Sequence, residues 1–202
     1  MAGRIVVLIS GSGSNMDALA QSCEAGEVPG RVVAVLADRE CPGLALAQAR
    51  GIPTKVVSMK DYPDRETWSD ALRAEVVGFD PDLVVSAGFM RILSPVFVDA
   101  FEGKLINLHP ALLPAFPGAH SVRDALEAGV TETGSTVHFV DREVDHGPTI
   151  LQEPVPVEAD DTEESLHTRI KAIEHRMLPQ ACRLILEGKV KLGDGGVDIQ
   201  GA

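Results

Sequence analysis

The chain has 202 residues, a formal net charge of −12 and 45% hydrophobic residues. This composition is typical of one soluble globular domain and excludes a disordered or collagen-like chain. The acidic balance and the scattering of Lys and Arg argue against nucleic acid as a partner. No apolar run is long enough to cross a bilayer or to act as a signal peptide, so no membrane partner is expected either.

Short runs of Val, Ile, Leu and Ala alternate with segments of helical periodicity in the first half of the chain. This alternation indicates parallel strands joined by crossover helices. Strands are predicted at residues 5–10, 32–37, 54–57, 83–87 and 105–108, and helices at 15–25, 44–50 and 65–77. A glycine follows each helix, at Gly26, Gly51 and Gly78, where a left-handed cap is expected. The pattern predicts a doubly wound, Rossmann-like α/β fold with a mostly parallel sheet.

The second half of the chain has a different pattern, with a helix predicted at residues 121–128 and then two consecutive strands at 134–140 and 149–157. Two strands in succession are typical of an antiparallel hairpin. The second strand contains Pro154 and Pro156, which cannot donate ladder hydrogen bonds, so it is expected at a sheet edge. A last helix begins at Asp161 or Thr162 and ends at Gly188, and a glycine-rich tail follows. We expect residues 1–202 to form one domain.

The cysteines and histidines show no metal-binding pattern. Cys23, Cys41 and Cys182 are an odd number of widely separated residues without a CxxC pair, which favours neither a disulfide framework nor a zinc ribbon. The histidines contain no HExxH motif. We therefore expect no metal and a reducing, cytoplasmic compartment.

Residues 10–15, the glycine loop, read SGSGSN and join the first predicted strand to the first helix. Backbone N–H groups and a helix N-terminus converge there, which favours an anion. Met16 stands where a dinucleotide fingerprint has its third glycine, and no Lys-Ser or Lys-Thr pair completes a P-loop. A terminal phosphate monoester is the expected ligand. The alternative is a tight turn that needs its glycines and an Asn15 N-cap for structural reasons alone.

Asn107 and His109 lie two residues apart at the end of a predicted parallel strand that Pro110 terminates. Period-two geometry puts both side chains on one face, and ligands bind at the carboxyl ends of such strands. An amide donor can stabilise an oxyanion, and an imidazole can move protons or add positive charge. The pair is suited to acyl transfer. The alternative is an Asn that caps a turn beside a His that backbone carbonyls satisfy.

A carboxylate that orients His109 is expected in residues 141–148, the acidic loop, which reads DREVDHGP. Asp145 is the natural choice by analogy with catalytic triads. Asp141 and Glu143 are alternatives, and an acidic loop between strands is often only a solvated turn. No GxSxG elbow is present, so a covalent intermediate has no evident nucleophile.

Four motifs in order resemble the phosphoribosylglycinamide formyltransferase family, the folate-dependent enzymes of purine synthesis. They are residues 5–15 (IVVLISGSGSN), 87–94 (AGFMRILS), 107–114 (NLHPALLP) and 137–140 (VHFV) leading to 145–148 (DHGP). The resemblance covers essentially the whole chain. It implies transfer of a formyl group from 10-formyltetrahydrofolate, as co-substrate, to the amine of glycinamide ribonucleotide, by a monomer or homodimer.

The resemblance also implies roles for individual residues. The implied catalytic residues are Asn107, His109 and Asp145. The implied nucleotide-binding residues are Gly13, Ser14, Asn15, Glu174 and Lys171. The implied folate-binding residues are Arg65, Met90, Arg91, Ile92, Leu93, Asn107, Val140, Asp141 and Asp145. By this reading residues 1–100 form the phosphate-binding half, residues 101–190 the catalytic and folate-binding half, and residues 191–202 a tail.

Several of these positions also have simpler interpretations. Residues 90–93 could be an apolar segment that packs under the sheet, and Glu174 an exposed partner of Lys171 on the same helix. Ala111 stands where many relatives have Ser, and His146 where Gly or Ala is frequent, so the pH profile could differ from that of relatives.

There are three alternatives to formyl transfer to the nucleotide. A formyltetrahydrofolate hydrolase would use the same three catalytic side chains with water as the acceptor, but it carries an additional N-terminal domain. A methionyl-tRNA formyltransferase needs a C-terminal RNA-binding domain and a basic surface. A phosphate-binding module with a decayed site is the alternative from a different class.

Overall fold

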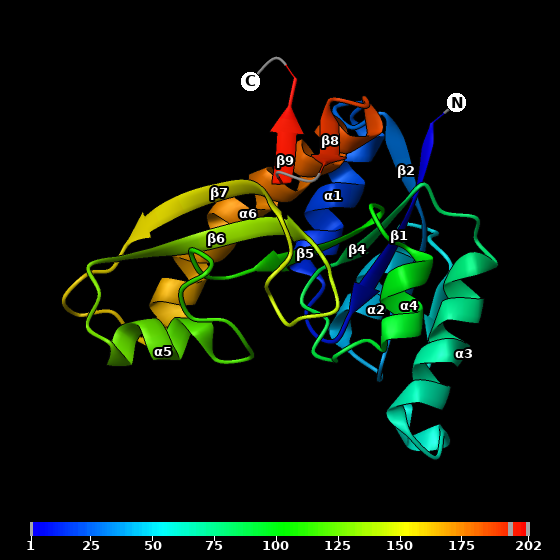
Figure 1. The fold of residues 1–202 in the computed structure, drawn as a ribbon, viewed down its shortest axis with the longest axis horizontal. Coiled ribbons are helices and arrows are strands. Elements are labelled where there is room, and N and C mark those ends of the chain that lie inside the picture. The colour runs from blue at the N-terminus through cyan, green and yellow to red at the C-terminus, as the bar shows by residue number, and fades with distance from the viewer. Residues whose placement is uncertain (1, 194–195, 201–202) are drawn as a thin grey trace.

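Seven strands form one sheet in the order β3-β2-β1-β4-β5-β6-β7 in the computed structural model, which describes residues 2–193 and 196–200 (Figure 1). The strands are β1 Gly3–Ile9, β2 Gly30–Ala37, β3 Thr54–Val56, β4 Leu83–Ser86, β5 Leu105–His109, β6 Glu132–Phe139 and β7 Thr149–Pro156. The helices are α1 Ser14–Glu24, α2 Pro42–Ala49, α3 Arg65–Val77, α4 Pro95–Ala100, α5 Ser121–Glu127 and α6 Glu163–Leu186, with a 3₁₀ turn η1 at Met59–Asp61.

The sheet is doubly wound, as the sequence predicts. β1 pairs in parallel with β2 on one side and with β4 on the other, and β4 pairs in parallel with β5. The chain therefore runs outward through β2 and β3, crosses back, and continues outward from β4. This reversal between β1 and β4 is a topological switch point, the place where open α/β sheets bind ligands.

The antiparallel part of the sheet also confirms the sequence-based prediction. β6 is antiparallel to β5, and β7 is antiparallel to β6. Pro154 lies opposite Gly134 and Pro156 opposite Glu132, on the last strand of the sheet. Because proline has no N–H to donate, an edge is the position that tolerates it.

The two faces of the sheet bury separate apolar layers. One layer contains Ile5, Val7 and Ile9 of β1 and buried residues of α1, α2, α5 and α6. The other contains Val6 and Leu8 with buried residues of α3 and α4. Alternation along β1 thus sends successive side chains into different layers, and both faces are covered by helices, which explains why the strand is continuously apolar.

Trp68 is fully buried in the second layer and connects α3 to the sheet edge. Its indole Nε1–H donates to the carbonyl oxygen of Val57 at 2.7 Å. The indole stacks on Phe89, with ring centroids 6.1 Å apart. A buried indole that has both a hydrogen-bond acceptor and an aromatic neighbour satisfies its polar and apolar parts together.

Two of the three predicted glycine caps are confirmed and one is wrong. Gly26 and Gly51 adopt left-handed backbone conformations, with φ of 76° and 69°. Gly78 instead has φ of −59° and continues the helical conformation after α3. The left-handed residue is Asp80, with φ of 46°, and aspartate is one of the few residues other than glycine that tolerates this region.

Helix α6 begins at the predicted cap. The Thr162 hydroxyl accepts from the Ser165 N–H, and the Ser165 hydroxyl accepts from the Thr162 N–H, which forms a capping box. The helix ends at Leu186, and Gly188 has φ of 69°. Although α6 is long, no helix within residues 2–193 and 196–200 is both long and apolar enough to cross a membrane.

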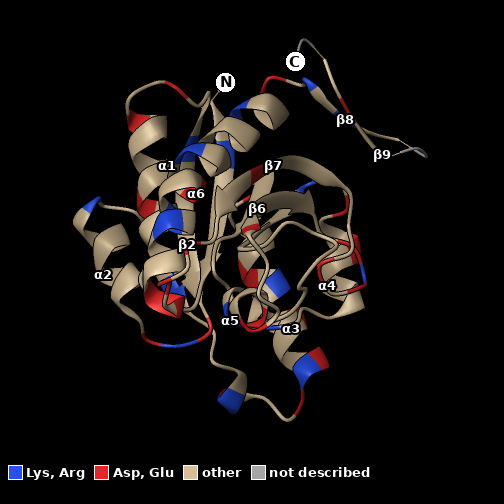
Figure 2. Cartoon of the chain, turned by 90° about the vertical axis from the view of Figure 1, so that its left-hand side faces the viewer, with Lys and Arg blue, Asp and Glu red and all other residues tan. Residues whose placement is uncertain are grey.

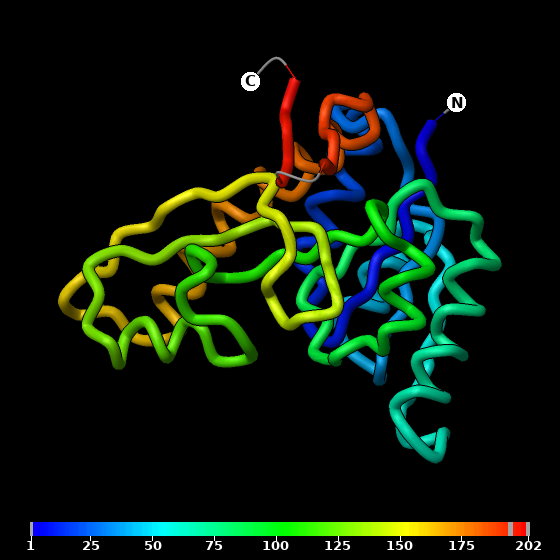
Figure 3. Tube along the Cα trace, in the orientation of Figure 1, coloured from blue at the N-terminus to red at the C-terminus, as the bar shows by residue number. Residues whose placement is uncertain are grey.

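The segment predicted as a tail contains a small second sheet. β8 (Val190–Gly193) pairs antiparallel with β9 (Gly196–Ile199). In Figures 1 and 3 these strands lie at the same end of the molecule as the N-terminus. Lys and Arg are scattered among Asp and Glu on the face that Figure 2 shows and form no basic stripe there.

Candidate active site

The candidate site lies at the carboxyl ends of β1, β4 and β5, around the switch point. The glycine loop follows β1, and residues 88–94 follow β4. Asn107 and His109 are among the last residues of β5, directly before Pro110. Parallel pairing of these three strands brings their carboxyl ends to one edge of the sheet. The topology therefore gathers the predicted site residues from distant parts of the sequence.

In the glycine loop, Gly13 takes the left-handed conformation, with φ of 74°, and is the N-cap residue of α1. Within the described part of the chain, no side chain caps this helix. The interpretation of Asn15 as a structural cap is therefore wrong. The first N–H groups of α1 remain available to an anion, which is where helices bind phosphate.

Asn15 instead contacts the last helix. Its Nδ2 donates to Glu174 Oε2 at 2.9 Å, and its buried Oδ1 has no hydrogen-bond partner among the described residues. The other oxygen of Glu174, Oε1, accepts from the Ser135 hydroxyl at 3.0 Å. Glu174 is 3% exposed, so the alternative of an exposed partner for Lys171 is wrong for Glu174. Lys171 itself is half-buried on α6, where its charge contributes to a lowered pKa of half-buried His167, for which burial is the larger cause.

Gly13→Ala is expected to destabilise the protein by roughly 1–3 kcal/mol. A Cβ at this position would lie 2.6 Å from the Gly43 Cα, and alanine disfavours the positive φ. Gly11→Ala is the matched control in the same loop, because a Cβ there meets no atom within 4 Å. Thermal melting of the two variants measures the difference, and equal melting temperatures would contradict the close packing of this loop on α2.

Asp145 lies between the two side chains of β5. Asn107 Nδ2 donates to Asp145 Oδ1 at 3.3 Å, and His109 Nδ1 lies 3.4 Å from Asp145 Oδ2. The backbone N–H of Gly118 also donates to Oδ2, at 2.8 Å. Asp145 has φ of 53°, which turns its side chain inward from the acidic loop. Of the three carboxylates considered in this loop, Asp145 is the one in contact with His109.

A second imidazole, His138, belongs to this cluster and received no catalytic role from the sequence. It pairs directly across from Asn107 in the β5–β6 ladder. Its Nδ1 donates to the Phe139 carbonyl at 2.8 Å, and its Nε2 lies 3.2 Å from Asn107 Nδ2 and 3.7 Å from Asp145 Oδ1. Burial acts to raise the pKa of Asp145, but His138, the Gly118 N–H and the charge of His109 outweigh it. The pKa of Asp145 therefore lies below its usual value, and the carboxylate is ionised at neutral pH.

The other nitrogen of His109 faces the loop that follows β5. Nε2 lies 2.9 Å from the carbonyl oxygen of Phe116, which can only accept, so Nε2 carries a proton. The other ring nitrogen, Nδ1, faces Asp145 Oδ2 at 3.4 Å. Phe116 itself has φ of 54°, a strained conformation for an aromatic residue. The Phe116 contact is the backbone-carbonyl partner that the structural alternative predicts, and the Asp145 carboxylate 3.4 Å from Nδ1 is a further neighbour that this alternative does not include.

Residues 90–93, which we call the donor segment, do not pack under the sheet as a unit. Met90 is 59% exposed and Ile92 57% exposed, whereas Leu93 packs against the second apolar layer. Exposed apolar side chains beside a cluster of polar groups are typical of ligand sites. Arg65 is the first residue of α3, and its hydrogen-bond partner among the described residues is its neighbour Glu66.

The remaining predicted folate contacts are at the start of the acidic loop. Val140 is half-buried, and its N–H donates to the Leu105 carbonyl at 2.9 Å. Asp141 Oδ2 lies 3.1 Å from His146 Nδ1, which closes the loop on itself. Arg142 ties the same loop to α4 through two hydrogen bonds to Asp99, at 2.9 and 2.7 Å.

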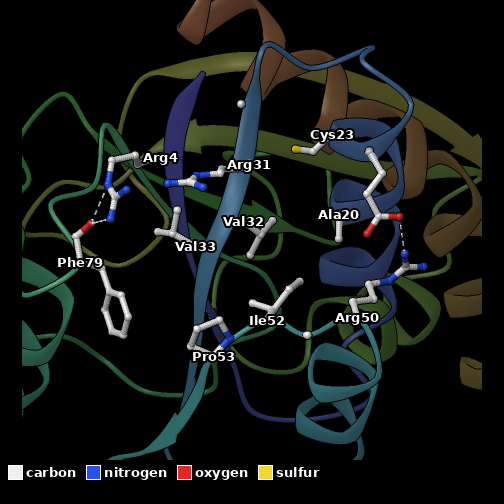
Figure 4. Close-up of a pocket in the computed structure, with 13 residues that line it drawn as sticks. Arg4, Ala20, Cys23, Arg31, Val32, Val33, Arg50, Ile52, Pro53 and Phe79 are labelled. Carbon is white, nitrogen blue, oxygen red and sulfur yellow. Dashed lines mark hydrogen bonds and ion pairs between the residues drawn. The ribbon is translucent and has the colours of Figure 1, made fainter. Parts of the chain in front are cut away.

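A separate cavity of about 540 Å³ lies at the opposite edge of the sheet, beside the amino ends of β1 and β2. Figure 4 shows Arg4, directed at the Phe79 carbonyl, and Arg50 on either side of β2. Arg50 Nη1 donates to Glu24 Oε2 at 2.7 Å. None of the predicted site residues lines this cavity. Within residues 2–193 and 196–200, no group of His, Cys, Asp and Glu could hold a metal ion.

The fold and the cluster have clear relatives. A formyl transferase family model matches residues 3–182, so the chain is a formyltransferase. A phosphoribosylglycinamide formyltransferase of Mycobacterium tuberculosis is 51% identical over 178 residues, 88% of this chain and 82% of that protein. The crystal structure of glycinamide ribonucleotide transformylase 1 from Symbiobacterium toebii has a TM-score of 0.95 and 44% identity, and covers 98% of this chain and 93% of that one. The chain therefore belongs to the phosphoribosylglycinamide formyltransferase family.

A formyltetrahydrofolate deformylase from Pseudomonas syringae shares the fold at lower identity. Its TM-score is 0.91 with 26% identity, over 98% of this chain and 66% of that chain.

Proposed function

We propose that the chain transfers the formyl group of 10-formyltetrahydrofolate to the amine of glycinamide ribonucleotide, yielding formylglycinamide ribonucleotide and tetrahydrofolate in purine biosynthesis. The observation that carries the proposal is the contact of Asp145 with both Asn107 and His109 at the switch point of the sheet. The similarity to the Mycobacterium and Symbiobacterium enzymes supports the same choice of substrates.

The acceptor is held by the glycine loop. The uncapped N–H groups of α1 bind its phosphate, with Gly13, Ser14 and Asn15 as the contacts, and Lys171 adds positive charge. The unpartnered Oδ1 of Asn15 and the carboxylate of Glu174 are available to donors on the ribose side of the nucleotide.

The donor folate lies along the donor segment and the acidic loop. Exposed Met90 and Ile92 pack against its ring, and backbone groups of residues 90–93 pair with its polar edge. Arg65, Val140 and Asp141 contribute further contacts. In this arrangement residues 1–100 chiefly bind the phosphate, and residues 101–190 bind the folate and carry the chemistry.

The reaction proceeds by direct attack. The neutral amine forms a bond to the formyl carbon, and the formyl oxygen gains negative charge. Asn107 and protonated His109 stabilise this oxyanion by hydrogen bonding. The amine then loses a proton, N10 of the folate gains one, and the bond between the formyl carbon and N10 breaks to release tetrahydrofolate.

Asp145 acts through its neighbours in this mechanism. As an ionised carboxylate beside Nδ1, it orients His109 and favours the charged ring. Asn107 Nδ2 donates to Asp145 Oδ1 and lies 3.2 Å from His138 Nε2. Donation to the oxyanion therefore requires that one Nδ2 hydrogen turn toward it.

The test compares acceptors. Purified protein is given 10-formyltetrahydrofolate with glycinamide ribonucleotide, with methionyl-tRNA or with water alone, and release of tetrahydrofolate is recorded. We expect release that depends on the nucleotide. Release with water alone, unchanged by the nucleotide, would overturn the proposal in favour of a hydrolase.

His146→Ala is expected to remove a pH dependence from folate binding. Its hydrogen bond to Asp141, with the charges of Glu143 and Asp141, raises the pKa of His146 above its usual value. The His146–Asp141 pair is therefore fully present below about pH 6.5 and is lost as the pH rises through the higher pKa of the folded protein. The wild-type KM for the folate should rise about two- to fivefold across this window, since exposed ion pairs are weak.

The control for this pH effect is the variant itself, whose folate KM should stay flat over the same range. A KM that varies identically in wild type and variant would show that another group titrates there.

The proposed compartment is the cytoplasm, and the proposed assembly is a monomer or homodimer. Three free cysteines, Cys23, Cys41 and Cys182, support a reducing environment. Sedimentation at several protein concentrations would distinguish the two assemblies.

A further inference from the structure

A buried carboxylate outside the catalytic cluster is attached to the donor segment. Asp38 is the first residue after β2, and its side chain is fully buried. Arg91 Nε of the donor segment donates to Asp38 Oδ2 at 2.7 Å, although the Arg91 side chain is 38% exposed. A carboxylate removed from water is stabilised only when it is paired and hydrogen-bonded, so this contact holds both partners.

A second arginine completes the pairing of Asp38. Arg39 Nη2 donates to Oδ2 at 2.9 Å, and its Nε lies 3.2 and 3.1 Å from Oδ1 and Oδ2. Burial acts to raise the pKa of Asp38, but hydrogen bonds from Arg39, Ser10 and Arg91 outweigh it. The pKa of Asp38 therefore lies below its usual value, and the carboxylate is charged at neutral pH.

Ser10 holds the backbone of the donor segment. The N–H of Met90 donates to Ser10 Oγ at 2.8 Å. The N–H of Ser10 donates in turn to the Gly88 carbonyl at 3.1 Å. The segment is thus held at two adjacent residues, at Met90 through its backbone and at Arg91 through its side chain.

The apolar side chains of the donor segment differ in their exposure. Met90 and Ile92 expose more than half of their surface, and Leu93 packs on the second apolar layer. Hydrogen bonds are directional and apolar contacts are not, so the Ser10 and Asp38 contacts fix the backbone orientation at the start of the segment.

We propose that Asp38 is a positioning residue that holds the donor segment in its folate-binding orientation through its ion pair with Arg91. The proposal rests on the proposed function, because that function assigns the folate to this segment. Asp38 touches no reacting atom in it. Its role is to keep the backbone groups and apolar side chains of residues 90–93 in place before the donor binds.

Asp38→Asn tests the proposal with little change in shape. Loss of the charge weakens the hold on Arg91, so the KM for 10-formyltetrahydrofolate should rise about tenfold while kcat changes less than about threefold. The KM for the nucleotide should change little. In unliganded protein, hydrogen exchange of the Met90 amide should become faster, which can be measured without any turnover.

Asp161→Asn is the matched control. The Asp161 side chain is also little exposed, at 2%, and is paired with an arginine, Arg169, but it lies just before α6. A merely structural effect would lower the melting temperature in both variants and leave the folate KM unchanged in both. We expect the KM to rise in Asp38→Asn alone.

A double-mutant cycle with Arg91→Ala separates the remaining possibilities. If Asp38 acts through Arg91, Asp38→Asn should add little to the KM of the Arg91→Ala variant. Independent, additive effects would overturn the proposal, as would an unchanged folate KM or an unchanged Met90 exchange rate in Asp38→Asn. If the wild-type protein transferred no formyl group, the proposed function would fail, and the exchange rate would still decide whether Asp38 holds the segment.

Discussion

His109→Ala is expected to lower turnover by about 10²–10⁴-fold, the range for loss of an oxyanion donor or an acid/base group. His109 is 4% exposed and its ring lies between Asp145 and the Phe116 carbonyl, where alanine supplies neither an N–H donor nor a positive charge. The loss should fall mainly on kcat, because the charge acts on an oxyanion that the ground state lacks. Steady-state kinetics with both substrates varied measures it.

His109→Gln distinguishes loss of chemistry from loss of structure. Glutamine keeps an N–H for the Phe116 carbonyl but cannot become cationic. We expect this variant to melt closer to the wild type than His109→Ala and still to show a low kcat. A glutamine variant with near-normal kcat would mean that His109 only holds the loop after β5.

Asn107→Asp should lower kcat by about 10²–10³-fold, the effect of removing one oxyanion donor. The substitution preserves the shape of the side chain but replaces its N–H donors with an oxygen. Asn107 Nδ2 lies 3.3 Å from Asp145 Oδ1, so the new oxygen would face an ionised carboxylate. Repulsion between the two should raise the pKa of one of them and disturb the charge beside His109.

Asn107→Ala is the companion variant, because it removes the donor without adding a carboxylate. If donation to the oxyanion is the main role, both variants should lose kcat to a similar degree. A large loss in Asn107→Asp with near-normal kcat in Asn107→Ala would assign the effect to repulsion and contradict the donor role.

The sequence predicted the parts of this site that depend on local geometry. Alternation along a strand is sufficient to place Asn107 and His109 on one face, and the structure confirms that both face Asp145. The glycine spacing indicated a tight strand-to-helix turn, in which Gly13 adopts the left-handed conformation. Apolar runs and helical periods predicted the order of strands and helices, because both faces of the sheet are covered.

Contacts between distant segments could not be predicted in this way. The choice of Asp145 over Asp141 and Glu143 depends on the backbone turn at Asp145, which spacing does not encode. His138 enters the cluster because β6 pairs with β5 in a register that sets it opposite Asn107. Asp38 reaches Arg91 across 53 residues, and only the strand order brings them together.

The small C-terminal sheet was missed for a different reason. Its sequence is rich in glycine, which favoured a tail without regular structure. Apolar residues nevertheless alternate in both strands, at Val190 and Leu192 and at Val197 and Ile199. This period-two pattern was the available signal for a hairpin.

The stacked pair of Trp68 and Phe89 makes the protein suitable for optical measurement. Trp68 is the single tryptophan of the chain, so all indole emission comes from one buried ring. That ring lies 6.1 Å, between centroids, from the phenyl ring of Phe89, the residue directly before Met90. The emission of Trp68 should therefore respond to movement at the start of the donor segment. Rearrangement there can be followed in real time without an attached dye.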